Sequence, residues 1–388
     1  DVSGGDGAAS MFSQNIDKPY FVTNYVYNRY VDVYDFVSGD LHQIRSEGES
    51  NGDFINIQAL DSNYGIIYSN YSGSSFQIIS YYGWDGFSED DRRTDAPSRI
   101  LSNSQLTANV SALTVSPHTT NSSTLMVGLE NGVVLKVEDA NTSNPKYTNL
   151  TGNKFLGSVS DIEYGKTEND IYVTFHNYGV DSVWYTSDGG GTWSSKEGDL
   201  PDMPVRAVLY NPLADDEVIV GTDLGVWYTK NFKDASPNWV QGNNGMTQVR
   251  VTDLEMRDDY KVFASTYGRG IFSSEFKEAN NDSTPPTIAI TSTTSGVTDG
   301  STTNDATIAL AFTVSETTSD FAAEDITVSN GTISSFAGSG TSYTATFTPT
   351  DQGACTIDVA ADTFNDAASN KNTVADQFNW TFDNVVPT

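Results

Sequence analysis

Four short apolar segments recur through the first two thirds of the chain and decide the fold. They read Val-Ser-Ala-Leu from residue 110, Val-Ser-Asp-Ile from 159, Val-Arg-Ala-Val from 205 and Val-Thr-Asp-Leu from 251, so the unit repeats every 46–49 residues. A turn and a second apolar run follow each segment, and a hairpin then leads to a third run. Repeats of this length with three or four strands are typical of propeller blades. A β-solenoid is the main alternative, but its repeats are usually shorter.

Weaker copies of the same unit precede these four. The sequence therefore predicts an all-β propeller of about six or seven blades over residues 1–279. An acidic, polar loop is expected at residues 84–107. The predicted repeats lie near 20–47, 53–83, 108–150, 157–200, 203–242 and 247–277.

The composition is strongly acidic. Among 388 residues, 51 are acidic and 20 are Lys or Arg, which gives a formal net charge of −31. A polyanion is repelled by nucleic acids and by anionic membrane surfaces, so neither is an expected partner. No stretch of about 18 apolar residues occurs, so no membrane insertion is expected. The charge suits either a solvated surface or bound divalent cations.

Cysteine usage points to the compartment. Cys355 is the only cysteine and lies in an alternating apolar run, so it is expected in a core, and an intrachain disulfide is excluded. A secreted animal protein of this size usually carries disulfides. Their absence favours a bacterial exoprotein, although cysteine count alone also allows a cytosolic one.

A second domain follows a polar, proline-containing linker at residues 280–284. Apolar residues alternate along several segments of 285–382, which predicts an Ig-like β-sandwich of about seven strands. Residues 383–388 echo 282–287 at an offset of 101 residues, so they are expected to begin a further repeat of a larger protein.

One turn carries a resemblance to a known family. The run from Thr186 to Trp193 has Asp188, Gly190 and Thr192 at the spacing of an Asp-box, in which the Asp accepts turn N–H groups and the Trp packs beneath the hairpin. With the blade spacing, the chain resembles the Asp-box (BNR-like) propellers of sialidases, sortilin-type receptors and xyloglucanases. The run 264–272 is similar to the last blade of such propellers in secreted Bacteroidetes proteins.

The second domain resembles the bacterial Ig-like repeats of giant adhesins. The resemblance rests on residues 314–316, 324–331, 343–349 and 365–370, where Ser369 stands in place of the usual glycine. Such repeats form rods, and in several relatives calcium stiffens the joints. Calcium is the one cofactor expected, against a reading in which these residues merely cap turns. The candidate ligands are Asp282, Glu316, Asp366, Asn370 and Asp383.

No motif selects a catalytic site. Five arginines are scattered through the blades without the context of a sialidase arginine triad, the three histidines lack metal-ligand spacing, and no pair of carboxylates stands out for glycoside hydrolysis. A candidate glycan-stacking loop holds Tyr81, Tyr82 and Trp84, with ordinary loop packing as the alternative.

These observations favour a non-enzymatic adhesin or structural module of a large appendage or filament on the bacterial cell surface. The propeller would be the interaction head and the Ig-like repeat the stalk. Expected partners are neighbouring repeats of the same long chain, further copies in a homo-oligomer or filament, and cell-surface glycans. The alternative is a glycan-binding or glycan-hydrolysing propeller of the sialidase or xyloglucanase type.

Overall fold

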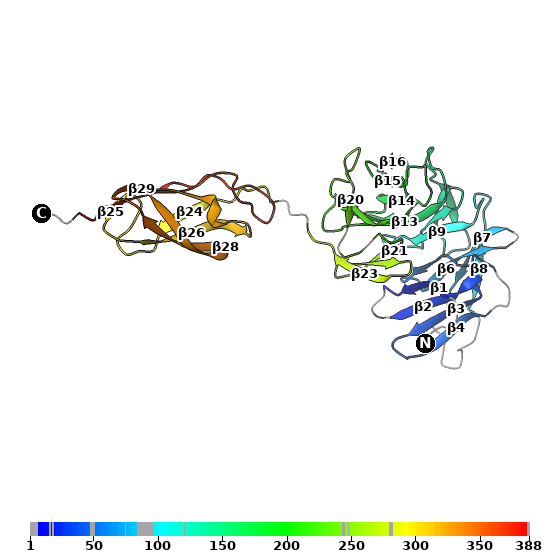
Figure 1. Ribbon diagram of the computed structural model, residues 1–388. Coiled ribbons are helices and arrows are strands. Elements are labelled where there is room, and N and C mark those ends of the chain that lie inside the picture. The colour runs from blue at the N-terminus through cyan, green and yellow to red at the C-terminus, as the bar shows by residue number, and fades with distance from the viewer. Residues whose placement is uncertain are drawn as a thin grey trace. The chain divides into compact units, whose positions relative to one another are not determined.

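The computed structural model describes residues 7–14, 17, 19–46, 51–73, 75–83, 96–119, 121–242, 245–246, 248–278 and 282–385. The chain divides into two compact units, Asp1–Glu278 and Ala279–Thr388. Both are built from strands, and the described residues contain no α-helix (Figure 1). No helix in this part of the chain is long and apolar enough to cross a membrane.

The first unit consists of antiparallel sheets that follow one another along the chain, and we number them as blades 1–6. Blade 1 comprises β1 (Gly7–Phe12), β2 (Tyr20–Tyr25), β3 (Tyr30–Asp35) and β4 (Leu41–Ser46). Blade 2 comprises β5 (Gln58–Asp61), β6 (Ile66–Ser72), β7 (Phe76–Tyr81) and β8 (Ser98–Leu101). Blade 3 comprises β9 (Val110–Val115), β10 (Leu125–Leu129), β11 (Val134–Glu138) and β12 (Lys146–Asn149). The short 3-10 turn η1 (Val26–Asn28) joins β2 to β3.

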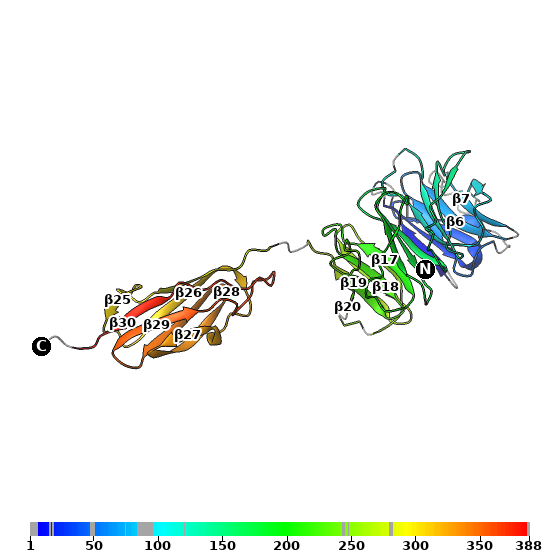
Figure 2. The same ribbon diagram turned by 90° about the horizontal axis from the view of Figure 1, so that it is seen from above.

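The four segments at 110, 159, 205 and 251 open four separate sheets, which confirms the propeller reading. Figure 2 shows the strands of blade 5 side by side. Blade 4 comprises β13 (Val159–Tyr164), β14 (Ile171–Phe175), β15 (Val183–Thr186) and β16 (Ser194–Ser195). Blade 5 comprises β17 (Val205–Tyr210), β18 (Val218–Thr222), β19 (Gly225–Thr229) and β20 (Val240–Gly242). Blade 6 comprises β21 (Val251–Met256), β22 (Lys261–Thr266) and β23 (Gly270–Glu275).

The first strand of each blade lies toward the middle of the unit. Strand β5 contacts β1 and β9, β13 contacts β9 and β17, and β17 contacts β21. The second strands β10, β14 and β18 are buried along their whole length, because each lies inside its sheet and is covered by a neighbouring blade on both faces. The apolar clusters accordingly combine residues of two adjacent blades.

Glycine sets the distance between some blades. A Cβ atom at Gly128, near the end of β10, would lie 2.4 Å from Val159 Cγ1, and one at Gly221 would lie 2.7 Å from Val251 Cγ1. Both valines open the next blade, so a larger residue would push the sheets apart.

Three details of the early blades differ from the predictions. Blade 1 starts at β1, before the predicted residue 20, and residues 98–101 form β8 although they were predicted to be loop. The repeat predicted near 53–83 begins later than expected, because its first strand β5 starts only at Gln58. The cause is Asn56, whose buried amide accepts a hydrogen bond from Asp53 N and donates to Ser69 Oγ, so the backbone turns before the strand begins.

The second unit is a sandwich of two sheets with the strand orders β24-β26-β28 and β25-β30-β29-β27. Its core contains Phe312, Phe347, Trp380 and the buried thiol of Cys355, as predicted for that residue. The strands, with the 3-10 turn η4 (Ala323–Asp325), are β24 (Ile288–Ser292), β25 (Ser301–Thr303), β26 (Ile308–Thr318), β27 (Ile326–Ser329), β28 (Gly331–Pro349), β29 (Gly353–Val359) and β30 (Phe378–Phe382).

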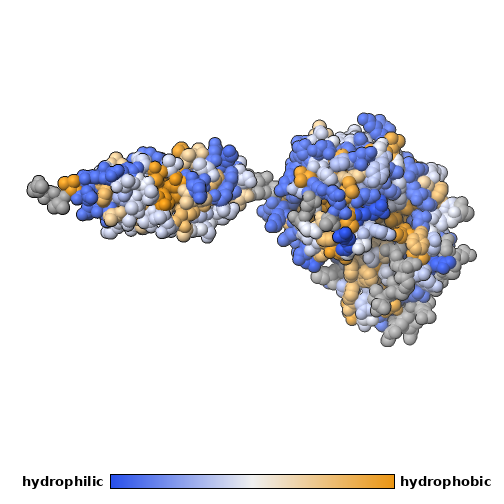
Figure 3. All heavy atoms as spheres, viewed as in Figure 1, coloured by the Kyte–Doolittle hydropathy of each residue, from blue (hydrophilic) through white to orange (hydrophobic). Residues whose placement is uncertain are grey.

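The surface agrees with the acidic composition. In the view of Figure 3, hydrophilic residues cover much of the described surface, with smaller apolar areas between them.

Candidate metal centre and propeller face

Three of the five predicted calcium ligands converge in the second unit. One carboxylate oxygen each of Asp282, Glu316 and Asp366 lies within 4.8 Å of the other two. Asp282 precedes β24, Glu316 lies near the end of β26, and Asp366 lies in the turn at residues 365–370. Segments far apart in the sequence thus bring three hard oxygen donors together, which is the ligand chemistry that calcium prefers.

Backbone hydrogen bonds hold these carboxylates in place. Asp366 Oδ1 accepts from the N–H groups of Ala368 at 2.7 Å and Asn370 at 2.9 Å, and Asp282 Oδ1 accepts from Thr284 N at 2.9 Å. The turn retains the left-handed conformation suited to glycine, because Ser369 has a φ of 69°.

The electrostatics of the cluster show what a cation would relieve. A hydrogen bond to Asp282 and the charges of Asp282 and Asp366 raise the pKa of Glu316, while the Thr284 N–H and the Glu316 hydrogen bond lower the pKa of Asp282. A proton on Glu316 would moderate the repulsion between neighbouring carboxylates. A bound divalent cation would do the same with more charge.

The other two predicted ligands have different roles. Asn370 Nδ2 donates to the carbonyl oxygen of Asp282 at 2.9 Å and to Asp366 Oδ2 at 3.0 Å, so this amide orients the cluster. Asp383 follows β30 and accepts from Gln352 Nε2 at 3.0 Å. Strand β30 runs to the end of the sandwich away from the segment that enters it (Figure 2), so the prediction that Asp383 joins this site is wrong.

The predicted Asp-box residues form one turn between β15 and β16. Asp188 Oδ1 accepts from Thr186 Oγ1 at 2.6 Å and from Thr192 N at 2.8 Å, and these bonds lower the pKa of Asp188 to about 2. Gly190, with a φ of 91°, donates its N–H to Thr186 Oγ1 at 3.0 Å. Trp193 donates its indole N–H to the carbonyl oxygen of Leu150 in blade 3 at 2.7 Å. The turn therefore also ties two blades together.

A repeated hydrogen bond places the residues of one propeller face. In each of blades 3–6, the residue after the second strand donates its N–H to the carbonyl oxygen of the residue before the first strand. The shared bond marks equivalent positions in the loops of these four blades. The pairs are Glu130 with Asn109, His176 with Ser158, Asp223 with Pro204, and Tyr267 with Arg250.

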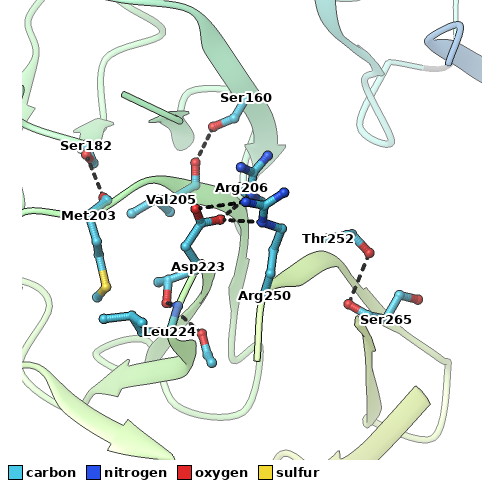
Figure 4. Close-up of polar contacts among 12 residues, drawn as sticks. Ser160, Ser182, Met203, Val205, Arg206, Asp223, Leu224, Arg250, Thr252 and Ser265 are labelled. Atoms are coloured by element: carbon cyan, nitrogen blue, oxygen red, sulfur yellow. Dashed lines mark hydrogen bonds and ion pairs between the residues drawn. The ribbon is translucent and has the colours of Figure 1, made fainter. Parts of the chain in front are cut away.

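One residue on this face departs from the repeat. In blades 3–6 the second residue of the first strand has no pairing partner in the second strand, so it forms a β-bulge. Three of these bulge residues carry a hydroxyl group that donates to a carbonyl oxygen. Ser160 Oγ, for example, donates to Val205 O at 2.7 Å. The fourth is Arg206, which instead reaches an acidic residue in the adjacent loop (Figure 4). The hydroxyl residues are Ser111, Ser160 and Thr252.

Two arginines converge on one carboxylate at this face. Asp223 Oδ1 lies 2.7 Å from Arg206 Nε and 3.0 Å from Arg250 Nε. The Arg250 guanidinium also lies 5.8 Å from the ring centre of Tyr267, which is 74% exposed. Sequence reasoning treated these arginines as scattered, although aligning the blades would have shown Arg206 in place of a serine or threonine.

A second set of acidic side chains, distinct from the Ig-like cluster, lies along the inner strands β13 and β21. Asp161 and Glu163 are half-buried, and Asp253 and Glu255 are exposed, but the protein around the middle of the unit reduces their solvation. This desolvation raises the pKa of Asp161 to about 7 and of Asp253 to about 6. Burial and then the Asp253 charge raise the pKa of Glu255 to about 7. Burial and the neighbouring acids raise the pKa of Glu163 further above its usual range.

The structure contradicts one residue of the predicted glycan-stacking loop and does not test the other two. Tyr81 is 2% exposed and its hydroxyl accepts from Asn28 Nδ2 at 3.1 Å, so its ring cannot stack on a sugar and this prediction is wrong. Tyr82 is half-buried beneath Arg99, at 5.6 Å from ring centre to guanidinium carbon. Trp84 lies outside the described residues.

Comparison with known families bears on the second unit. Residues 282–382 match the family model of a bacterial Ig-like domain. This bacterial Ig-like domain begins at Asp282, the first carboxylate of the cluster. Such domains are typical of surface proteins. No curated protein sequence matches the chain.

Solved structures bear on the propeller. The structure titled "Structure of U3-55K" matches with a TM-score of 0.51 and 11% identity over 71% of this chain and 79% of that one. The structure titled "Crystal Structure of Mitotic Checkpoint Complex" gives 0.47 and 12% over 70% and 81%. The first agrees with the propeller fold and says nothing of function. The Asp-box resemblance is not tested by these matches and stays a prediction.

Proposed function

We propose that the chain is a non-enzymatic, extracellular module of a bacterial surface appendage, in which the propeller is the interaction head and the Ig-like domain a calcium-stiffened stalk. The observation that carries this proposal is the convergence of Asp282, Glu316 and Asp366 at the start of a bacterial Ig-like domain. Three carboxylates that repel one another gain most from a divalent cation, which is abundant outside cells.

Calcium at this position would order the segment that enters the Ig-like domain. Asp282 supplies a carboxylate from that segment, and its carbonyl oxygen already accepts from Asn370. A cation shared with Glu316 and Asp366 would fasten the segment to the sandwich. Stiffness near a domain boundary is what a stalk needs, because a flexible boundary lets the head collapse toward the surface.

Limited proteolysis tests the stalk. Lys277 is exposed and lies five residues before Asp282, so trypsin can report on this segment. We expect millimolar calcium to slow cleavage after Lys277 several-fold in the wild-type chain and to leave it unchanged in Asp366→Asn. Equal cleavage rates with calcium and with chelator would contradict a calcium-stiffened stalk.

The geometry of the arginines supports a non-enzymatic head. Arg206 and Arg250 both bind Asp223, so two cations that could hold an anionic sugar are already paired. Arg45 is buried and donates Nε to Asn28 O at 2.7 Å. Sialidase and glucanase assays check this part, and turnover above that of an Asp223→Ala control would overturn it.

Glycan binding without hydrolysis is the second candidate. Tyr267 and Tyr178, which is 66% exposed, lie in the loops after the second strands of blades 6 and 4 and offer aromatic surface on the same propeller face. A glycan array with the wild-type chain and with Tyr267→Ala tests it. Loss of a specific signal in the variant would favour a lectin over a structural head.

A further inference from the structure

Blade 6 ends one strand short of its neighbours. In the described part of the chain, blades 1–5 each have four strands, whereas blade 6 has β21, β22 and β23. Residues of β23 are mostly exposed, while the third strands β15 and β19 are mostly buried or half-buried. Within the described residues no strand pairs with the outer edge of β23, and an open sheet edge of this kind is a common template for strand addition.

The fourth strands of blades 4 and 5 show what lies at this edge in the two preceding blades. A tryptophan stands directly before each of them and donates its indole N–H to the residue that follows the fourth strand of the preceding blade. Trp193 reaches Leu150 O at 2.7 Å, and Trp239 reaches Lys196 O at 3.0 Å. Trp239 is 5% exposed, so this anchor is almost completely enclosed.

The joint between blades 4 and 5 is filled by aromatic side chains. Tyr172 and Tyr185 pair across β14 and β15, and the ring of Phe232 lies 5.3 and 5.5 Å from theirs. Phe232 in turn contacts Trp239, with 6.4 Å between ring centres. The tryptophan thus completes a packed layer between two blades.

The joint between blades 5 and 6 has the same plan without the tryptophan. Ile219 and Tyr228 pair across β18 and β19 as the two tyrosines do in blade 4. Phe276 matches Phe232, because each donates its N–H to the carbonyl of the residue one or two places before the second strand of its blade. The described chain then leaves blade 6 without a fourth strand.

A cavity of about 300 Å³ occupies the place of the missing anchor. Its apolar lining comes from both blades, and its outer rim includes residues of the open edge strand. The lining includes Ile219, Tyr228, Leu254, Val262, Phe272 and Phe276.

We infer that the open edge of blade 6 binds an extended segment of a partner polypeptide, antiparallel to β23, with a tryptophan that enters this cavity. The two filled joints define that chemistry. All neighbouring strands within the blades are antiparallel, and both anchors are tryptophans at the same position. A second copy of this chain is a poor occupant because each copy carries a formal charge of −31. The inference goes beyond the proposed function and does not depend on calcium.

A fluorescent peptide with the sequence of residues 235–242, Ala-Ser-Pro-Asn-Trp-Val-Gln-Gly, tests the inference on the full chain. We expect saturable binding by fluorescence anisotropy, at least tenfold weaker binding when the peptide tryptophan is Ala, and slower hydrogen exchange at residues 270–275 in the complex. Absence of saturable binding, or equal affinity for the two peptides, overturns the inference.

Two protein variants locate the binding site. Ala264→Phe fills the cavity and Ser273→Pro removes an N–H from the edge strand, where proline is tolerated, and each should weaken peptide binding at least tenfold. Leu156→Ala, at an exposed position between blades 3 and 4, is the control and should bind normally. Binding that survives both site variants contradicts the inference. Strong protection of residues 270–275 before peptide is added also does so, since the protein's own chain would then cover the edge.

Discussion

In the propeller, four acidic side chains are spread along the inner strands β13 and β21, whereas in the Ig-like domain three converge within 4.8 Å. Asp161 is held by the N–H groups of Val208 at 2.9 Å and Ile162 at 2.8 Å, so its environment is already built by the backbone. Glu316 has a neighbouring carboxylate as its partner. Proximity of the carboxylates, more than their number, marks the Ig-like cluster as the candidate cation site, whereas the propeller carboxyls are expected to respond to pH.

The largest expected effect sharpens the Ig-like side of this comparison. Calcium at about 10 mM should raise the unfolding midpoint of the Ig-like domain by on the order of 10 °C, because binding to the native state alone stabilises it. Asp366→Asn should abolish the shift in calorimetry of the full chain. Asp383→Asn, outside the cluster, should retain it. A shift that depends on Asp383 and not on Asp366 would place the cation elsewhere.

The next effect concerns the propeller. The four inner carboxyls have native pKa values above their unfolded values near 4, so between about pH 4 and 7 the native state binds more protons than the unfolded state. The free energy of unfolding should therefore rise as the pH falls through this window. We expect the propeller midpoint at pH 5 to exceed that at pH 7.5 by on the order of 5 °C.

A pair of substitutions assigns that pH dependence. Glu163→Gln removes the charge of the inner carboxyl with the strongly raised pKa, so it should raise the midpoint at pH 7.5 and flatten the profile. Glu278→Gln, at an exposed position, is the matched control and should do neither. A flat wild-type profile would break the comparison, because the inner carboxyls would then behave like surface ones.

The smallest expected effect lies in the turn that positions Asp366. Ser369→Gly relieves a left-handed backbone but also frees the unfolded chain, so the net gain should be about 0.5 kcal/mol. Chemical denaturation of the full chain measures it, and calcium affinity should stay unchanged. A loss of stability would mean that the serine side chain contributes more than its conformation costs.

The repeat spacing was enough to predict the propeller, because each recurring apolar segment is the first strand of one blade. The candidate calcium ligands were named from a resemblance, and three of them, Asp282, Glu316 and Asp366, lie close together. Asp383 could not be assigned correctly, since sequence spacing does not say at which end of a sandwich a strand finishes. Tyr81 was misread for a similar reason, because alternation along β7 does not reveal that the adjacent blade covers its ring.

The Arg206–Asp223–Arg250 cluster and the short blade 6 required coordinates. Arg206 is an exception to a hydroxyl pattern that becomes visible only when the bulges are aligned in space. The described residues of blade 6 include no tryptophan at the anchor position, and this became informative only when the joint between blades 4 and 5 showed what Trp239 does there.

The pairing of β25 with β30 has a mechanical consequence. These are parallel strands, joined by the pairs Ser301–Trp380, Thr302–Thr381 and Thr303–Phe382, and β30 is the last strand of the sandwich. When the two ends of the domain are pulled apart, parallel pairs of this kind are loaded in shear, and their hydrogen bonds must break together instead of one at a time. Tension along the chain would therefore meet a short clamp at the exit of the domain.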